Sequence, residues 1–322
     1  MYLGIEIGGT KLQLGVGPGD GALAALVRLA VRPEQGASGI LRQIQEAALP
    51  LIQQYPIQAV GFGFGGPVDG AAGKVLHSHQ VAGWNGFPLA DWCRDNLHRP
   101  AVVANDSDSA GLAEAVLGAG RGHRVVVYSN VGSGIGGALV LDGHLHSGSS
   151  GIAAEIGHLR PGLQAEQSNQ TVESLASGWA IAATVRERLA AANAQGEPPT
   201  GPAAELLARC GGDPQRLTTQ IVSRAAADGN PIACAAFSQA CRAFGWALAQ
   251  VLTLVAPSVL VIGGGVSLAA DEVFLEPLRQ SIARYVFPPL TGNYAVLRAA
   301  LGEEVVVHGA LLLASRSVVS ST

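Results

Sequence analysis

Short apolar runs alternate with glycine-rich turns and amphipathic stretches along the chain. Residues 125–128 are a β-branched run that predicts a buried strand, a glycine cluster occupies 132–137, and a second apolar run covers 138–141. Strand, glycine turn and strand together predict a hairpin whose tip presents backbone N–H groups. Such groups bind phosphate oxygens, so the pattern favours a phosphate-binding loop.

The first residues of the chain repeat this order. Apolar residues alternate over 3–7, Gly8, Gly9 and Thr10 turn the chain, and apolar residues alternate again over 12–16. Two such hairpins, about 125 residues apart, indicate an internal duplication. Pairing of the two halves would put two phosphate loops on facing walls of one cleft.

Strands and helices alternate through the rest of the chain. Apolar spacing predicts strands at 59–64, 101–104, 259–262 and 294–297, and helices at 40–54, 88–97, 109–117, 171–192, 231–256, from 271, and at 304–315. This alternation is typical of the α/β class. Residues 118–123 are the expected junction between two domains, the number that a length of 322 residues favours.

Composition narrows the classes of function. A hydrophobic content of 48% with 14% charged residues indicates a compact globular protein. The net charge is −4 and no run of Lys or Arg occurs, so neither nucleic acid nor an anionic membrane is expected as a partner. The four cysteines lack metal-site spacing and are expected to be buried thiols in a reducing compartment. With no signal sequence and no apolar run of membrane-spanning length, we predict a cytoplasmic location.

Polar residues that follow the glycine cluster at 132–137 suggest a binding site for hydroxyl groups. Glu155 and His158, an acid and a base three residues apart, suit hydroxyl groups, and phosphate-binding backbone upstream of them predicts a kinase acting on a polyol. The competing interpretation of Gly132, Gly134 and Gly137 is a dinucleotide site. That motif needs a helix after the glycines, whereas a strand is predicted here. A glycine-rich hairpin without a ligand stays open at this point.

Two further groups of residues are candidates. Asn105, Asp106 and Asp108 stand where a predicted strand meets a predicted helix, a place where Asn and Asp commonly cap helices, and we expect Asp108 to be a cap. Lys11 and Lys74 are the only lysines among many arginines. Lysine supplies a compact point charge where arginine supplies a planar fork, so a retained lysine is a candidate for phosphate binding.

Six motifs in a fixed order carry a resemblance to a known family. They are residues 6–11 (EIGGTK), 65–68 (GGPV), 105–106 (ND), 132–137 (GSGIGG), 155–158 (EIGH) and 261–265 (VIGGG). Through them the chain resembles the ROK family, which groups bacterial sugar kinases with related repressors. The resemblance implies an α/β actin-like ATPase fold, two RNase H-like domains around a central cleft. The small domain would comprise residues 1–118 with a C-terminal helix of about 304–322, and the large domain residues 119–303.

The resemblance also implies roles for individual residues. Asp106 would be the general base, and the residues that bind the sugar would be Gly65, Gly66, Asn105, Asp106, Glu155, His158 and Glu173. The residues that bind the nucleotide would be Glu6, Gly8, Gly9, Thr10, Lys11, Gly132, Ser133, Gly134, Gly264 and Gly265. ATP with Mg²⁺ is the implied cofactor set, and a homodimer is the implied assembly. Phosphoryl transfer suits such residues, because it asks a protein mainly to position groups and neutralise charge.

Two departures from the family pattern stand out. Glu6 occupies a position where Asp is commoner, although the longer side chain keeps the charge. His158 is usually followed by cysteines that complete a structural zinc site, whereas residues 159–172 contain none, so we expect no structural zinc. Two pairs of spaced histidines could chelate a metal as strand neighbours, although such pairs are usually structural: His77 with His79, and His144 with His146.

The implied function is an ATP- and Mg²⁺-dependent hexose kinase that phosphorylates a sugar such as glucose at its 6-hydroxyl. Gly83 and Trp84 resemble the glucokinase-like branch more than the acetamido-sugar branch. One alternative is a sugar-binding regulator. Family repressors carry an N-terminal helix-turn-helix, and the strand predicted from residue 2 argues against that class. The other alternative is a sugar-processing hydrolase that uses Asp106 and Glu155.

Overall fold

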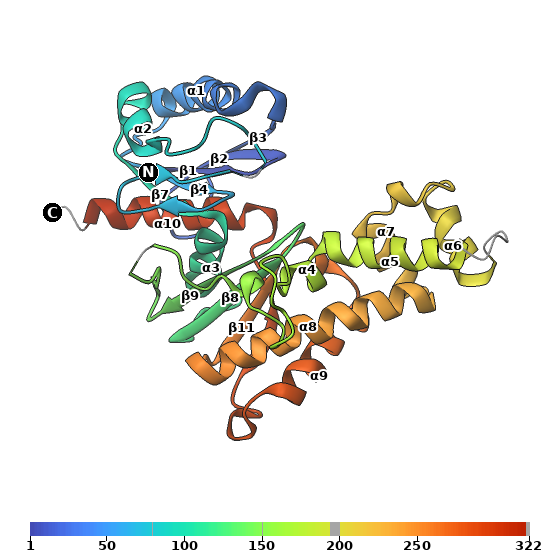
Figure 1. Ribbon diagram of the computed structural model, residues 1–322. Coiled ribbons are helices and arrows are strands. Elements are labelled where there is room, and N and C mark those ends of the chain that lie inside the picture. The colour runs from blue at the N-terminus through green and yellow to red at the C-terminus, as the bar shows by residue number, and fades with distance from the viewer. Residues whose placement is uncertain (79, 150, 194–199, 320–322) are drawn as a thin grey trace. The chain divides into compact units, whose positions relative to one another are not determined.

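The computed structural model describes residues 1–78, 80–149, 151–193 and 200–319 (Figure 1). Two five-stranded sheets and a two-stranded sheet form its β-structure. The two large sheets have the orders β3-β2-β1-β4-β7 and β10-β9-β8-β11-β12. Across the described ranges, no helix combines the length and the apolar character that crossing a membrane requires.

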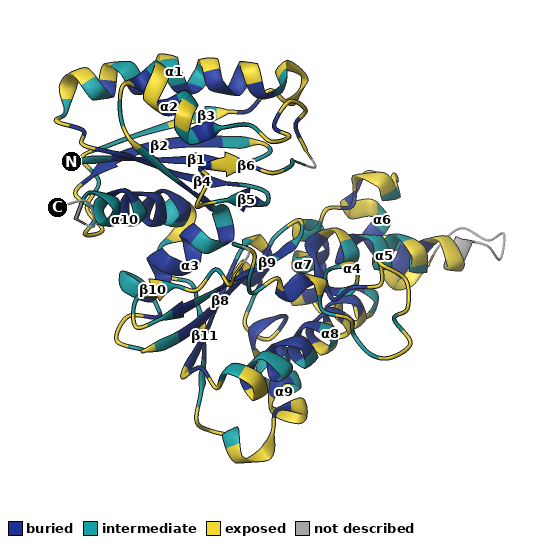
Figure 2. Ribbon diagram, turned by 60° about the vertical axis from the view of Figure 1, so that its left-hand side comes forward, coloured by how far each residue is buried: buried dark blue, intermediate teal, exposed yellow. Residues whose placement is uncertain are grey.

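The first sheet begins with an antiparallel meander and continues with parallel strands. Its strands are β1 (Tyr2–Ile7), β2 (Lys11–Gly17), β3 (Ala25–Ala30), β4 (Val60–Phe64) and β7 (Ala101–Asn105). β1, β2 and β3 pair antiparallel, whereas β4 and β7 extend the sheet parallel to β1. The inner strands are buried while α1 (Gly36–Gln54) turns an exposed face outward (Figure 2). Parallel strands are covered on both faces, which is why β4 is a continuous buried run.

The second sheet repeats this strand order. Its strands are β8 (Val125–Val131), β9 (Ile135–Leu141), β10 (His144–Leu145), β11 (Val259–Gly263) and β12 (Ala295–Arg298). β9 pairs antiparallel with β10, and β11 pairs parallel with β12. The same strand order therefore occurs twice, which agrees with the predicted duplication. The small sheet pairs β5 (Val68–Asp69) with β6 (Lys74–Val75).

The helices complete two compact units. Unit 1 holds Met1–Tyr128, Ala138–Ala154 and the chain from Ala299 onward, and unit 2 holds Ser129–Gly137 and Glu155–Arg298. The helices of unit 1 are α1, α2 (Leu89–Leu97), α3 (Asp106–Val116) and α10 (Val305–Val319). Those of unit 2 are α4 (Glu173–Ala176), α5 (Gly178–Asn193), α6 (Gly201–Arg209), α7 (Thr219–Ala227), α8 (Pro231–Val255) and α9 (Leu275–Tyr285). In unit 1 the apolar helix α10 packs on β1, β4 and α3 (Figure 1).

The structure corrects several predicted helices. α3 begins at Asp106 and not at 109, and α9 begins at Leu275 and not at 271. The helix predicted over 171–192 is two helices that break at Ser177. Helices α6 and α7 and strands β3 and β10 were not predicted. α1 begins earlier than expected, at Gly36, and continues through Pro50.

Candidate active site

Three parallel strands of unit 1 end beside one another. β1, β4 and β7 are followed by Gly8, Gly65 and Asp106, respectively. The Gly65 N–H donates to the Ile7 carbonyl at 2.8 Å, and a Cβ added to Gly65 would lie 3.5 Å from Asp106 Oδ2 and 3.6 Å from Gly8 Cα. The carboxyl edge of a parallel sheet is the usual place for a ligand, so these three groups form the candidate site of unit 1.

Asn105 joins two of these strand ends. Its Oδ1 accepts the N–H of Ser107 at 2.8 Å and that of Asp108 at 3.4 Å, while its Nδ2 donates to the Gly66 carbonyl at 2.9 Å. Asn105 has the extended backbone of an N-cap, whereas Asp108 lies inside α3. The prediction that Asp108 is the cap is therefore wrong. Asn105 caps the helix and holds the Gly65–Gly66 turn with the same side chain.

Asp106 is the first residue of α3, and its carboxylate is partly exposed. Oδ1 accepts the N–H of Ser107 at 2.7 Å. Desolvation raises the pKa of Asp106 to about 6 against the lowering effect of that hydrogen bond, and the negative charge of Glu6 raises it further. A carboxylate with a pKa close to the working pH accepts a proton more readily than one near 4, which is the property of a general base.

A polar network supports the first glycine turn. Lys11 Nζ lies 3.1 Å from Glu6 Oε1, and Gln13 Nε2 donates to Glu6 Oε2 at 2.7 Å. Both side chains also donate to the Glu303 carbonyl, Lys11 at 3.3 Å and Gln13 at 3.0 Å. Burial raises the pKa of Glu6, and the adjacent Lys11 lowers it. Lys11 therefore supports the turn as a partner of Glu6 while keeping 40% of its side chain exposed.

Sequence reasoning did not single out Gln13 or Gln80. Gln13 is fully buried and faces Glu6 across the β1–β2 pair, so the register of the predicted hairpin could have revealed it. Gln80 packs directly on Gly9: a Cβ added to Gly9 would lie 1.3 Å from Gln80 Oε1. Nothing local in the sequence indicates that contact, because 71 positions separate the two residues.

The second glycine turn follows β8 in unit 2. The Gly132 N–H donates to the Gly134 carbonyl at 2.9 Å, and the Ile135 N–H donates to Glu173 Oε2 at 2.7 Å. The backbone N–H groups of Ser133 and Gly134 stand between these two bonded positions. That these two groups receive phosphate oxygens, as the hairpin pattern predicts, stays a prediction.

The carboxyl end of β11 meets this turn within unit 2. Gly264 has a φ of 83°, and a Cβ added there would lie 2.4 to 2.7 Å from three backbone atoms of Val131. A Cβ on Gly265 would meet nothing within 4 Å. Gly264 is therefore required by close packing of two strand ends, and Gly265 leaves open backbone at the same edge.

Glu155, His158 and Glu173 form an electrostatic cluster in unit 2. The His158 N–H donates to the Glu155 carbonyl at 3.0 Å in a short 3₁₀ turn, and both side chains are exposed. Desolvation raises the pKa of Glu155, nearby His158 lowers it, and Glu173 raises it. The structure thus brings together the three unit 2 side chains that were predicted to bind sugar hydroxyls.

The loop after His158 is held by hydrogen bonds. The Val172 N–H donates to the Leu159 carbonyl at 2.9 Å, and Arg160 Nη1 donates to the carbonyls of Ala165 (3.2 Å) and Gln167. Within the described ranges, no group of three or more His, Cys, Asp or Glu side chains could hold a metal ion.

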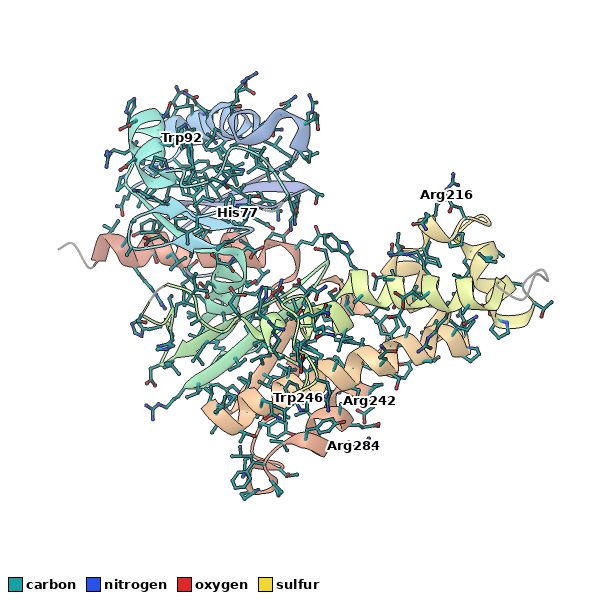
Figure 3. All side chains as sticks on the ribbon, in the orientation of Figure 1. His77, Trp92, Arg216, Arg242, Trp246 and Arg284 are labelled. Carbon is teal, nitrogen blue, oxygen red and sulfur yellow. The ribbon has the colours of Figure 1, made fainter. Side chains whose placement is uncertain are left out.

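Two of the spaced histidines have partners for their side chains. His77 Nδ1 lies 2.8 Å from Asn85 Oδ1, and His144 Nδ1 lies 3.0 Å from the Asp142 carbonyl (His77 is labelled in Figure 3). His79 lies outside the described residues. The predicted absence of structural zinc stays a prediction.

Known proteins resemble this chain over nearly its whole length. The family model described as the ROK family matches residues 2–317. A glucokinase from Streptomyces coelicolor is 32% identical, with 98% of this chain and 97% of that protein covered. A glucokinase from Thermotoga maritima is 29% identical, with 96% and 95% covered. The crystal structure of a ROK family glucokinase from Streptomyces griseus, in complex with glucose and AMPPNP, is 32% identical with a TM-score of 0.82, covering 98% of this chain and 99% of that one.

These similarities confirm the predicted α/β fold of the actin-like ATPase type. They extend across both glycine turns, the Asn105–Asp106 junction and the Glu155–His158 turn, so each candidate position lies inside the matched region.

Proposed function

The chain belongs to the ROK family, and from that premise we propose that it transfers the γ-phosphate of ATP to the 6-hydroxyl of a hexose such as glucose. Glucokinases of 29% and 32% identity over nearly the whole chain, and a similar glucokinase crystallised with glucose and AMPPNP, support an ATP-dependent sugar kinase. We also propose which hydroxyl accepts the phosphate and which residues bind the substrates and transfer the proton.

The observation that carries the proposal is the edge where Gly8, Gly65 and Asp106 meet. The Asp106 carboxylate, with a pKa of about 6, lies there beside Gly65, and Gly65 also lies beside Gly8, the first residue of a glycine turn that was predicted to bind phosphate. We assign Asp106 to accept the proton of the sugar hydroxyl as its oxygen bonds to phosphorus. The second oxygen of Asp106 would take this proton, because Oδ1 accepts the Ser107 N–H.

Two sets of polar groups are assigned to the sugar. Asn105 keeps the Gly65–Gly66 turn in place, so the backbone of these two glycines and the Asn105 amide would meet the sugar together. Glu155, His158 and Glu173 can each pair with a hydroxyl. Carboxylates that bridge hydroxyl groups discriminate between epimers, because an inverted hydroxyl leaves a buried polar group unpaired.

The nucleotide is assigned to the glycine turns. Gly8, Gly9, Thr10 and Lys11, with Glu6 orienting the lysine, would bind phosphate in unit 1. Ser133 and Gly134, next to Gly132, would do so in unit 2. Gly264, together with the open backbone of Gly265, would approach the adenosine. Mg²⁺ bound together with the nucleotide would supply charge neutralisation at the phosphates.

The remaining expectations concern the setting of the enzyme. We propose a cytoplasmic homodimer that uses a small sugar and takes neither nucleic acid nor membrane as a partner. We expect no structural zinc, because Arg160 and backbone hydrogen bonds hold the loop that follows His158. Metal analysis of the purified protein checks this, and near-stoichiometric zinc that survives dialysis would contradict it.

Formation of ADP in the presence of a panel of hexoses tests the proposed reaction. The expected result is sugar-dependent ADP with glucose and none with 6-deoxyglucose, which lacks the accepting hydroxyl. A regulator would bind sugar without consuming ATP. A hydrolase would release product from a glycoside without ATP. ADP formation with 6-deoxyglucose would assign the transfer to another hydroxyl.

A further inference from the structure

Glu173 makes a contact that binding a sugar does not require. Its Oε2 accepts the N–H of Ile135, the residue directly after the glycine turn, at 2.7 Å. A Cβ added to Gly134 would lie only 2.5 Å from the same oxygen. The carboxylate therefore packs against the backbone of the second phosphate turn.

The segment that carries Glu173 holds the turn at a second point. The Gly178 N–H donates to the Gly132 carbonyl at 2.8 Å, and a Cβ on Gly178 would approach that carbonyl to 2.7 Å. This bond is available because the helix breaks at Ser177, whose hydroxyl accepts the Ala180 N–H at 3.2 Å and begins α5. Residues 173–178 thus hold both sides of the turn, and Ser133 and Gly134 lie between the two bonds.

Glu155 and His158, which are also proposed to bind sugar, lie on a turn that contacts the glycine turn through Ile135. A Cβ added to Gly157, inside the Glu155–His158 turn, would lie 2.3 Å from the Ile135 carbonyl. The N–H of Ile135 points to Glu173 and its carbonyl contacts the turn that carries His158. Ile135 thus connects the side chains proposed to bind sugar with the turn proposed to bind phosphate.

We infer that Glu173 is a positioning residue that couples sugar binding to nucleotide binding. Its Oε2 holds the Ile135 N–H and its Oε1 takes a sugar hydroxyl, so a bound sugar restrains the carboxylate and, with it, the N–H groups of Ser133 and Gly134. Sugar then raises the affinity for nucleotide. Linkage requires nucleotide to raise the affinity for sugar by the same factor. This inference rests on the proposed function. It adds that sugar binding and nucleotide binding strengthen each other.

Calorimetric binding of ADP, with and without glucose, tests the coupling. For the wild type, saturating glucose should tighten ADP by about fivefold or more, the lower end of common coupling factors. In Glu173→Ala the turn loses its support, so ADP should bind about tenfold more weakly even without glucose, and glucose should no longer tighten it. In Glu173→Gln the amide oxygen can still accept the Ile135 N–H. Its ADP affinity without glucose should therefore stay within about threefold of the wild type.

Two matched variants separate coupling from simple sugar binding. Glu155→Ala removes a proposed sugar ligand that does not touch Gly134, so it should weaken glucose and leave the ADP affinity measured without glucose unchanged. Gly134→Ala pushes the Glu173 carboxylate away without removing it, so it should weaken ADP as Glu173→Ala does. Because Gly134 itself belongs to the proposed phosphate turn, the readout that decides is the tightening of ADP by glucose, which Gly134→Ala should abolish even if Glu173→Ala does not fold.

The outcomes are distinct. If Glu173→Ala weakened glucose alone, with ADP binding normally in the absence of sugar, Glu173 would be a sugar ligand and the inference would be wrong. ADP affinity that is independent of glucose in the wild type would also overturn it, while sugar-dependent ADP formation would leave the proposed kinase intact. A wild-type protein that binds no ADP would contradict both the coupling inference and the proposed kinase function.

Discussion

The turn at residues 8–11 and the turn at residues 132–134 occupy equivalent places in two sheets of the same strand order. They differ in what supports them. The first turn relies on side chains of its own hairpin, since Glu6, Lys11 and Gln13 bind one another and reach the Glu303 carbonyl. The second relies on residues 173–178, which bind its backbone from about 40 positions away.

This difference follows the chemistry proposed for each turn. The first hairpin carries a lysine and keeps it partly exposed, so its support also places a positive charge for phosphate. The second has no charge of its own, and it is supported by the Glu173 carboxylate, which we also propose to bind the sugar. Under the proposed function, the repeated strand order therefore provides two turns for phosphate, one supported by a charged side chain and the other by a carboxylate proposed to bind sugar.

The largest expected effect lies beside the first turn. Asp106→Asn keeps the shape of the side chain and its hydrogen bond from Ser107 but cannot take a proton, so the turnover rate should fall about 10²- to 10⁴-fold. Glucose binding, measured by calorimetry, should change much less, because an amide also pairs with a hydroxyl.

The pH profile is the control for this variant. Because the pKa of Asp106 is about 6, wild-type kcat/KM should decline as the pH falls through about 6. A variant with wild-type turnover would show that Asp106 only begins the helix that Asn105 caps, and that its carboxylate takes no part in proton transfer.

The second-largest expected effect is a loss of stability at Gly264 that its neighbour Gly265 should not show. Gly264→Ala forces a Cβ into the Val131 backbone at a φ of 83°, so it should reduce stability by about 2–4 kcal/mol. Gly265→Ala is the matched control, because its Cβ would enter open space. It should melt like the wild type and raise the KM for ATP. Thermal melting checks the first substitution, and equal melting of both variants would contradict the close approach of β11 to β8.

The frame of the site was predictable because its signals are local. Apolar alternation places β1, short apolar runs place β8 and β11, and glycine positions mark the turns that follow them. The α/β class follows from the alternation of strands and helices. The family resemblance then selected Asp106 from several acidic residues at strand ends. Nothing in the local pattern around Asp106 distinguishes a base from a cap.

The supports were not predictable because their partners are distant in sequence. The predicted helix over 171–192 looked continuous, and its break at Ser177 makes sense only with the Gly178 bond to Gly132 in view. Asn105 was expected among the sugar ligands, but its ties to Gly66 and Ser107 come from tertiary structure. Only Gln13 had a usable signal, the hairpin register that places it opposite Glu6.

A smaller effect is expected from the charge of the first turn. Lys11→Ala removes the positive charge near the proposed phosphates, so the KM for ATP should rise about tenfold while glucose binding persists. Lys74→Ala is the matched control, because Lys74 is the only other lysine and is exposed on β6. Steady-state kinetics with varied ATP decide the point. If both variants kept wild-type kinetics, Lys11 would serve the turn only as a partner of Glu6.

The smallest effect is on stability and comes again from Asp106. Its pKa is raised in the folded protein to about 6 from 3.8, so the ionised carboxylate is disfavoured by folding. This cost is fully present above pH 6, shrinks as the pH falls from 6 toward 3.8, and vanishes below that, where the group is protonated in both states. Asp106→Asn removes the cost and should melt about 2–4 °C above the wild type at pH 8, with partial exposure keeping the gain small. At pH 4 the two proteins should melt together. A variant that melts below the wild type at pH 8 would mean that the ionised Asp106 carboxylate stabilises the edge where Gly8, Gly65 and Asp106 meet. The raised pKa of Asp106 would then be wrong.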